Sequence, residues 1–205
     1  SGGGTNLQAI LDRINDGRLP GVRIIGVVAS RSGTFAEYRA RRAGIPVEVV
    51  NRTRQESLAE YDSKMFASLA SFAAGPPDLI VLAGFLSRLG PRLVKEYQGR
   101  LINVHPALIP SFCGPGMYGL RPHEAALERG VKVTGATVHF VDEHYDEGPI
   151  ILQKCIPILS DDTPESLQLR VMQDCEQVIL PEAIRLIATD KIYIDGRNVR
   201  FREGK

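Results

Sequence analysis

The chain has 205 residues, 43% hydrophobic and 24% charged, which fits one soluble globular domain spanning residues 1–205. Its net charge of +1 lacks the basic excess of a nucleic-acid-binding protein or of a protein adapted to anionic membranes, and no window approaches the ~18 apolar residues of a membrane span. Cys113, Cys155 and Cys175 form no C-x-x-C pair, so we predict a cytoplasmic protein with reduced thiols, without a disulfide framework or a metal site.

A glycine-rich turn opens the chain and leads into a helical pattern. Gly3, Gly4, Thr5 and Asn6 precede apolar residues at the spacing of an amphipathic helix, namely Leu7, Ile10, Leu11 and Ile14. The free amides and the dipole of a helix start attract anions, and glycine lets a phosphate approach the backbone closely. The pattern predicts a phosphate site, although a glycine cluster at a chain end is equally typical of a flexible tail.

Apolar runs alternate with helical patterns through the first half of the chain. We predict strands at Val22–Ala29, Val47–Val50, Leu79–Ala83 and Leu101–Val104. The alternation indicates an α/β fold with a single doubly wound, mostly parallel, Rossmann-like sheet. A glycine turn of this kind normally follows a buried strand, so we expect a first strand to be missing ahead of it.

Two polar residues end the last of these predicted strands. Asn103 and His105 are two residues apart, so both side chains point to one face of the strand, and Pro106 ends it. An amide donor beside an imidazole suits a reaction in which negative oxygen develops while a proton moves. A strand end with two satisfied polar residues is the competing interpretation.

The stretch from Pro110 to Pro122 contains three glycines and three prolines, which predicts an irregular surface loop and a candidate lid. Cys113 lies in this loop without a local base or cationic partner, so we do not predict a nucleophile there. A helix should follow at Pro122–Arg129.

The second half of the chain predicts further strands at Gly135–Val141 and Ile150–Ile158. The loop between them carries four carboxylates, including Asp146, and solvation alone can explain such a loop. A helix should begin after Thr163, an N-cap residue followed by proline, and Pro181 should break or kink it. We expect a closing hairpin at Tyr193–Phe201.

A family pattern runs through the chain in four segments. They are Ser1-Gly-Gly-Gly-Thr-Asn-Leu-Gln8, Leu82-Ala-Gly-Phe-Leu86, Ile102-Asn-Val-His-Pro-Ala-Leu-Ile-Pro110, and Gly135-Ala-Thr-Val-His-Phe-Val141 through Asp146-Glu-Gly-Pro-Ile-Ile-Leu-Gln153. Their order and spacing resemble the glycinamide ribonucleotide formyltransferases, members of the folate-dependent formyltransferases. The resemblance implies transfer of a formyl group from 10-formyltetrahydrofolate to the amino group of glycinamide ribonucleotide in purine biosynthesis.

The same resemblance implies the residues of the site. Asn103, His105 and Asp146 would be catalytic, and His139 would lie near them as support. The ribonucleotide phosphate would bind at Gly3, Gly4, Thr5 and Asn6, and its ribose at Glu176. The folate would be lined by Phe85, Leu86, Ser87, Arg88 and Leu89 on one loop and by Phe140, Val141 and Asp142 on another.

The chain departs from the family pattern at several places. Leu86-Ser87-Arg88-Leu89 stands where Met-Arg-Ile-Leu is common, so an arginine contact to folate is displaced or lost. The loop from Ser111 to Pro122 is longer than usual, and one extra residue precedes Glu176 in its helix.

Other functions share parts of this pattern. A formyltetrahydrofolate deformylase is similar in its Asn, His and Asp positions, but the glycine turn and the lack of an added regulatory domain argue against it. A methionyl-tRNA formyltransferase would add a C-terminal domain and a basic surface. A non-catalytic nucleotide-binding module is the alternative from another class. The sequence leaves the oligomeric state open.

The residue types suit the implied chemistry independently of the family. His105 can move the proton from an attacking amine to a departing nitrogen, and Asn103 can stabilise the oxyanion. We expect Asp146 to orient the imidazole and raise the pKa of His105, because a nearby negative charge favours the cation.

Overall fold

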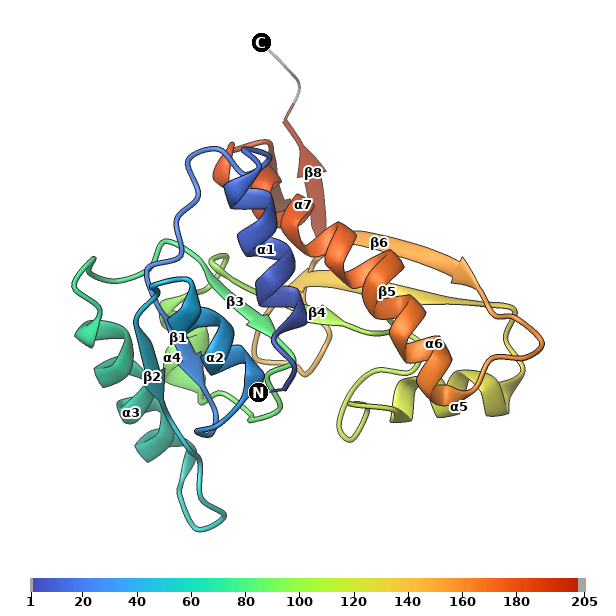
Figure 1. Ribbon diagram of the computed structural model, residues 1–205, viewed down its shortest axis with the longest axis horizontal. Helices are drawn as coiled ribbons and strands as arrows, with labels where there is room; N and C mark the ends of the chain where they lie inside the picture. The colour runs from blue at the N-terminus through green and yellow to red at the C-terminus, as the bar shows by residue number, and fades with distance from the viewer. Residues whose placement is uncertain (1, 203–205) are drawn as a thin grey trace.

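The computed structural model describes residues 2–202 and has helices on both sides of a central sheet region (Figure 1). Helical segments are α1 Thr5–Asn15, α2 Phe35–Arg42, α3 Leu58–Ser71, α4 Pro91–Glu96, α5 Arg121–Arg129, α6 Pro164–Val171, the π-helical turn η1 Met172–Glu176, and α7 Gln177–Ala188. Strands are β1 Val27–Ala29, β2 Val47–Val49, β3 Ile80–Ala83, β4 Leu101–His105, β5 Val133–Phe140, β6 Ile150–Pro157, β7 Ile192–Asp195 and β8 Asn198–Phe201. The predicted α/β, Rossmann-like class is confirmed.

The strands pair in two groups within the described residues. β1 and β2 form a parallel two-stranded sheet, and the remaining strands form a six-stranded sheet in the order β3-β4-β5-β6-β8-β7. β3 and β4 are parallel, whereas β5 is antiparallel to both of its neighbours. The sequence predicted one sheet; here the inner edges of β1 and β3 pair with no strand in residues 2–202, and the apolar side chains of β3 stay half-buried.

Alternate side chains of β4 enter two different cores. Ile102 and Val104 pack with β5, α1, α6 and α7 on one side. Leu101 packs with α3 and α4 on the other side. Burial of apolar surface at about 25 cal/mol per Å² is what holds these layers together. Figure 1 shows α1, in blue, and α6 and α7, in orange, together in front of the β4 to β6 strands.

Helix starts follow the local sequence. Ser57 with Glu60 and Thr163 with Ser166 form capping boxes at α3 and α6. The buried Asp62 of α3 accepts hydrogen bonds from the amides of Gly90, Arg92 and Leu93, which satisfies the otherwise free start of α4.

Two predicted elements differ from the structure. The strand expected over Val22–Ala29 is confined to β1, because β2 offers partners only from Val47 onward and Pro46 cannot donate to a ladder. The break expected at Pro181 does not occur there: α7 runs through Pro181, and the irregularity lies upstream, in η1. A π turn holds one residue more than an α turn, which accommodates the extra residue expected before Glu176.

No helix within residues 2–202 combines the length and apolar character needed to cross a bilayer.

Candidate active site

The polar end of β4 faces polar residues of β5. In the antiparallel register, Asn103 lies opposite His139 and His105 lies opposite Thr137. Directly opposed residues point to the same face and lie within contact distance. The ladder therefore collects these side chains on one patch of the sheet.

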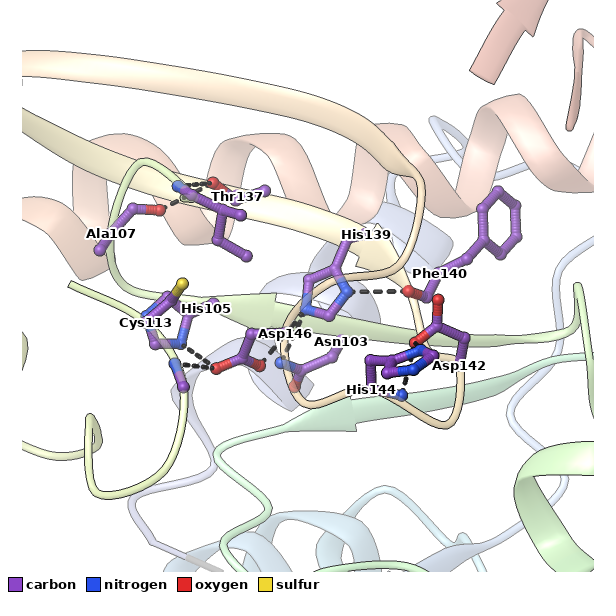
Figure 2. Close-up of polar contacts among 12 residues, drawn as sticks. Asn103, His105, Ala107, Cys113, Thr137, His139, Phe140, Asp142, His144 and Asp146 are labelled. Atoms are coloured by element: carbon purple, nitrogen blue, oxygen red, sulfur yellow. Dashed lines mark hydrogen bonds and ion pairs between the residues drawn. The ribbon is translucent and has the colours of Figure 1, made fainter. Parts of the chain in front are cut away.

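Asp146 reaches this patch from the loop between β5 and β6. The loop leaves β5 where the Val141 amide donates to the Leu101 carbonyl over 2.8 Å, and it then folds back beside the patch (Figure 2). Gly148 lies so close to Phe140 that a Cβ would be 1.9 Å from the Phe140 carbonyl oxygen. Asp146 itself has a φ of 58°, which aspartate adopts more readily than most residues.

Asp146 lies between two imidazole rings (Figure 2). Its Oδ2 is 3.7 Å from Nδ1 of His105, and its Oδ1 is 3.7 Å from Nε2 of His139. The Gly114 amide also donates to Oδ2 over 2.9 Å. The structure thus brings Asn103, His105 and Asp146 together with His139, although these residues come from separate segments.

The irregular loop that contains Phe112 fixes the tautomer of His105. Nε2 of His105 is 2.9 Å from the carbonyl oxygen of Phe112, which can only accept a hydrogen bond, so Nε2 carries the proton. In the neutral ring Nδ1 then has a free lone pair on the side of Asp146. His105 is therefore arranged as a base at Nδ1.

Burial sets the charge of His105. Removal from water lowers the pKa of His105 more than the Phe112 carbonyl and Asp146 raise it. Our prediction of a raised pKa is wrong in its net direction, because the ring is only 4% exposed and desolvation outweighs the carboxylate. The neutral base is the form favoured near pH 7.

Asp146 keeps its charge despite being buried. Burial would raise the pKa of its carboxyl, but the His139 ring in its cationic form, the Gly114 amide and His105 together outweigh burial and lower it. A carboxylate beside His105 stabilises the imidazolium that forms when the ring takes a proton.

His123 was missed by the sequence analysis. Its ring on α5 is fully buried, and neither nitrogen has a hydrogen-bond partner. Burial, with a smaller contribution from the nearby His105, lowers its pKa to about 4. His123 lies in the first turn of α5, directly after a loop rich in Gly and Pro. Nothing in the sequence around it signals that the side chain is buried.

The glycine turn meets the π-helical turn at the start of α1. Gly4 is the N-cap residue with a φ of 65°, no side chain caps the helix, and a Cβ on Gly4 would be 2.6 Å from the Cα of Ala36. Nδ2 of Asn6 donates to Oε2 of Glu176 over 2.7 Å. Burial raises the pKa of Glu176, and the Asn6 hydrogen bond offsets part of that rise. The predicted phosphate turn and the predicted ribose ligand are therefore neighbours.

The loops expected to line the folate present few of their side chains outward. Leu89 and Phe140 are buried in the two cores, so their side chains are not presented to a ligand. Phe85 and Ser87 are half-buried, Leu86 and Arg88 are exposed, and the Asp142 carboxylate accepts from the His144 amide of its own loop.

Three loops each carry an exposed aromatic or apolar side chain. Leu86, Tyr118 and Tyr145 are 55%, 44% and 45% exposed. Burial is the main cause of the raised pKa of Tyr145; the nearby Asp146 and Tyr118 raise it further, whereas Arg88 lowers it.

Residues 106–120 are irregular, as predicted, and α5 begins at Arg121. Thr137 of β5 anchors the start of this loop to the sheet. Its hydroxyl donates to the Ala107 carbonyl over 2.7 Å and accepts from the Ile109 amide over 3.1 Å. Burial and the nearby Asp146 raise the pKa of Cys113, which agrees with its rejection as a nucleophile.

A family model described as formyl transferase matches residues 1–184. The chain belongs to the formyl transferase family. Phosphoribosylglycinamide formyltransferase of Escherichia coli strain K12 is 36% identical over 97% of this formyl transferase and 92% of the relative. The trifunctional purine biosynthetic protein adenosine-3 of Gallus gallus is 39% identical, but the match covers 95% of this chain and only 18% of that protein. The sequence-based identification is confirmed.

Solved formyl transferases have the same fold. Glycinamide ribonucleotide transformylase 1 from Symbiobacterium toebii matches with a TM-score of 0.88 and 40% identity, covering 99% of this chain and 91% of the other. A formyltetrahydrofolate deformylase from Pseudomonas syringae also matches, with a TM-score of 0.84 and 26% identity, but the match covers only 62% of that chain. Identity and coverage both favour the transferase over the deformylase.

Proposed function

We propose that this formyl transferase moves the formyl group of 10-formyltetrahydrofolate to the amino group of glycinamide ribonucleotide. The observation that carries the proposal is the clustering of Asn103, His105 and Asp146 on the polar face of β4 and β5. Neighbours named for this reaction support the choice of substrates. The alternative is release of formate to water, as the deformylase likeness suggests.

Each catalytic side chain has one task in this reaction. The bound folate supplies an activated formyl group; a bond forms from the amine nitrogen to the formyl carbon, and the bond from that carbon to the folate nitrogen breaks. Nδ1 of His105 takes the proton lost by the amine and returns it to the departing nitrogen. Asn103 donates from Nδ2 to the oxygen that becomes negative, and Asp146 stabilises the charged imidazole meanwhile.

The ribonucleotide would bind at the start of α1. The uncapped amides after Gly4 and the helix dipole suit its phosphate. Glu176 has one oxygen on Asn6 and a second oxygen for a ribose hydroxyl. The exposed Leu86, Tyr118 and Tyr145 suit the flat ring of the folate.

An acceptor test distinguishes the candidate reactions. Purified protein is given 10-formyltetrahydrofolate with and without glycinamide ribonucleotide, and tetrahydrofolate release is followed. Release that requires the ribonucleotide supports the transferase. Release without it supports a deformylase, and no release under either condition supports a silent binding module.

A further inference from the structure

His139 contacts both polar partners of the reaction and is almost fully buried, with 1% of its surface exposed. Nε2 is 3.3 Å from Nδ2 of Asn103, and Nδ1 is 2.8 Å from the carbonyl oxygen of Phe140 (Figure 2). The Asp146 carboxylate is 3.7 Å from Nε2, beyond the usual hydrogen-bond range. The shorter contact of Nε2 is therefore with the Asn103 amide.

The Phe140 carbonyl decides which nitrogen of His139 carries the proton. A carbonyl oxygen only accepts, so Nδ1 must donate to it, and in a neutral ring Nε2 is left with a lone pair. That lone pair can accept a hydrogen from Asn103 Nδ2 but repels the amide oxygen. Asn103 is consequently fixed with its nitrogen toward His139, and an amide flip would place two lone pairs against each other.

We infer that His139 is a positioning residue that orients the Asn103 amide by accepting a hydrogen bond at Nε2. One hydrogen of Nδ2 is held by the ring, and the second is directed to the oxygen that becomes negative. Without the acceptor, the amide can rotate and offer Oδ1, which repels that oxygen. The expected kinetic effect of this inference rests on the proposed formyl transfer. The hydrogen bond between His139 and Asn103 does not depend on that proposal.

Two substitutions separate orientation from packing. His139→Leu fills the buried site without an acceptor, whereas His139→Gln offers an amide oxygen near the position of Nε2. We expect His139→Leu to lower kcat by roughly 10 to 10², somewhat less than removal of a whole oxyanion donor, with the KM for the ribonucleotide nearly unchanged. His139→Gln should recover most of the kcat. Thr134→Val, a buried polar change on the same strand but in its first half, is the matched control and should leave kcat unchanged.

A double variant tests whether the effect passes through Asn103. If His139 acts by orienting the amide, His139→Leu should add almost nothing to the loss caused by Asn103→Ala. Equal losses in the Leu and Gln variants, or full multiplication in the double variant, would show a structural role only and overturn the inference.

The tautomer can be read without any activity. Long-range ¹H–¹⁵N spectra of the whole protein, with His139→Gln to assign the signals, should show His139 protonated at Nδ1 and bare at Nε2. A proton on Nε2 would pair with Asp146 instead and overturn the inference. Because this readout needs no turnover, a protein that fails to transfer formyl groups would refute the proposed function and still test His139.

Discussion

Two carboxyl groups withdrawn from solvent respond to burial in opposite ways. Asp146 has a lowered pKa because His139, the Gly114 amide and His105 outweigh desolvation. Glu176 has a raised pKa because desolvation outweighs one hydrogen bond from Asn6. The number and charge of the partners, and not burial alone, decide which acid stays ionised.

The opposite pKa shifts suggest different tasks for the two regions, with proton transfer at Asp146 and ligand binding at Glu176. A fixed negative charge beside an imidazole serves proton transfer, whereas a carboxyl with few partners is left free to exchange hydrogen bonds with a neutral ligand. Disturbing the Asp146 region should therefore change turnover, and disturbing the Glu176 region should change binding.

The largest effect is expected for His105 and Asp146, the proposed catalytic pair. Asp146→Asn keeps the shape and removes the charge, so it should further lower the pKa of His105 and reduce kcat by roughly 10² to 10⁴, the scale of positioned proton transfer. His105→Ala should lose a similar factor. Steady-state kinetics with ribonucleotide binding measured in parallel checks both, and binding should hardly change.

The double variant of Asp146→Asn and His105→Ala should lose much less than the product of the single losses, because groups that act as a unit are not additive. If the two losses multiply instead, Asp146 acts independently of His105 and is better explained as a solvated loop residue. Near-normal turnover of Asp146→Asn would do the same.

A second prediction concerns acid stability near His105. The pKa of His123 is about 4 in the fold against a usual 6.5, so the unfolded chain takes up the proton first as the pH falls. Stability present above pH 6.5 should decline by about 1.4 kcal/mol per pH unit, and by about 3 kcal/mol down to pH 4. Urea unfolding from pH 7 to 4.5 measures this.

His123→Leu should flatten that decline, and His144→Gln, a change at an exposed loop residue, should not. An unchanged slope in His123→Leu would mean that other groups govern acid unfolding. Glu176 has the opposite sign: its raised pKa favours the fold at low pH and loses that contribution as the pH rises through the folded pKa.

A third prediction tests the binding side. Glu176→Gln retains an oxygen for Asn6 but removes the charge, so the KM for the ribonucleotide should rise about tenfold, the size of one hydrogen bond to a charged group. The kcat at saturation should stay within a few-fold. A loss confined to kcat would contradict the division between the two regions.

The smallest effects are expected for two glycines. Gly4→Ala would meet the Cα of Ala36 at 2.6 Å and should weaken ribonucleotide binding, with a loss of about 1–2 kcal/mol in stability from its positive φ. Gly148→Ala would push the Asp146 loop off Phe140 and should lower kcat. Gly17→Ala has a φ of 78° with nothing within 4 Å, so it should lose stability without affecting either step.

The sequence predicted most of the strands, and it predicted that Asn103 and His105 share one face of a strand, for a physical reason. Period-two placement of Asn103 and His105 on an apolar run fixes a polar face, whatever the neighbours are. The return of Asp146 to that face could not be derived from spacing, because it depends on the Gly148 contact and a positive φ. Only the family resemblance pointed to it.

Other features depend on packing that a linear pattern does not contain. Desolvation reversed the expected pKa direction of His105 and concealed His123. The shortened β1 reflects the length of its partner β2, and the inward side chains of Leu89 and Phe140 reflect which core lies behind each loop.

The π turn at Met172–Glu176 allows the Glu176 side chain to point toward Asn6 even when the helix contains one additional residue before it. Each residue added to a regular helix rotates everything after it by about 100°, which would swing this carboxyl away from Asn6. The π turn absorbs one residue and leaves the 2.7 Å contact in place. Deleting one residue from this turn should convert it to an ordinary α turn with the contact between Asn6 and Glu176 intact.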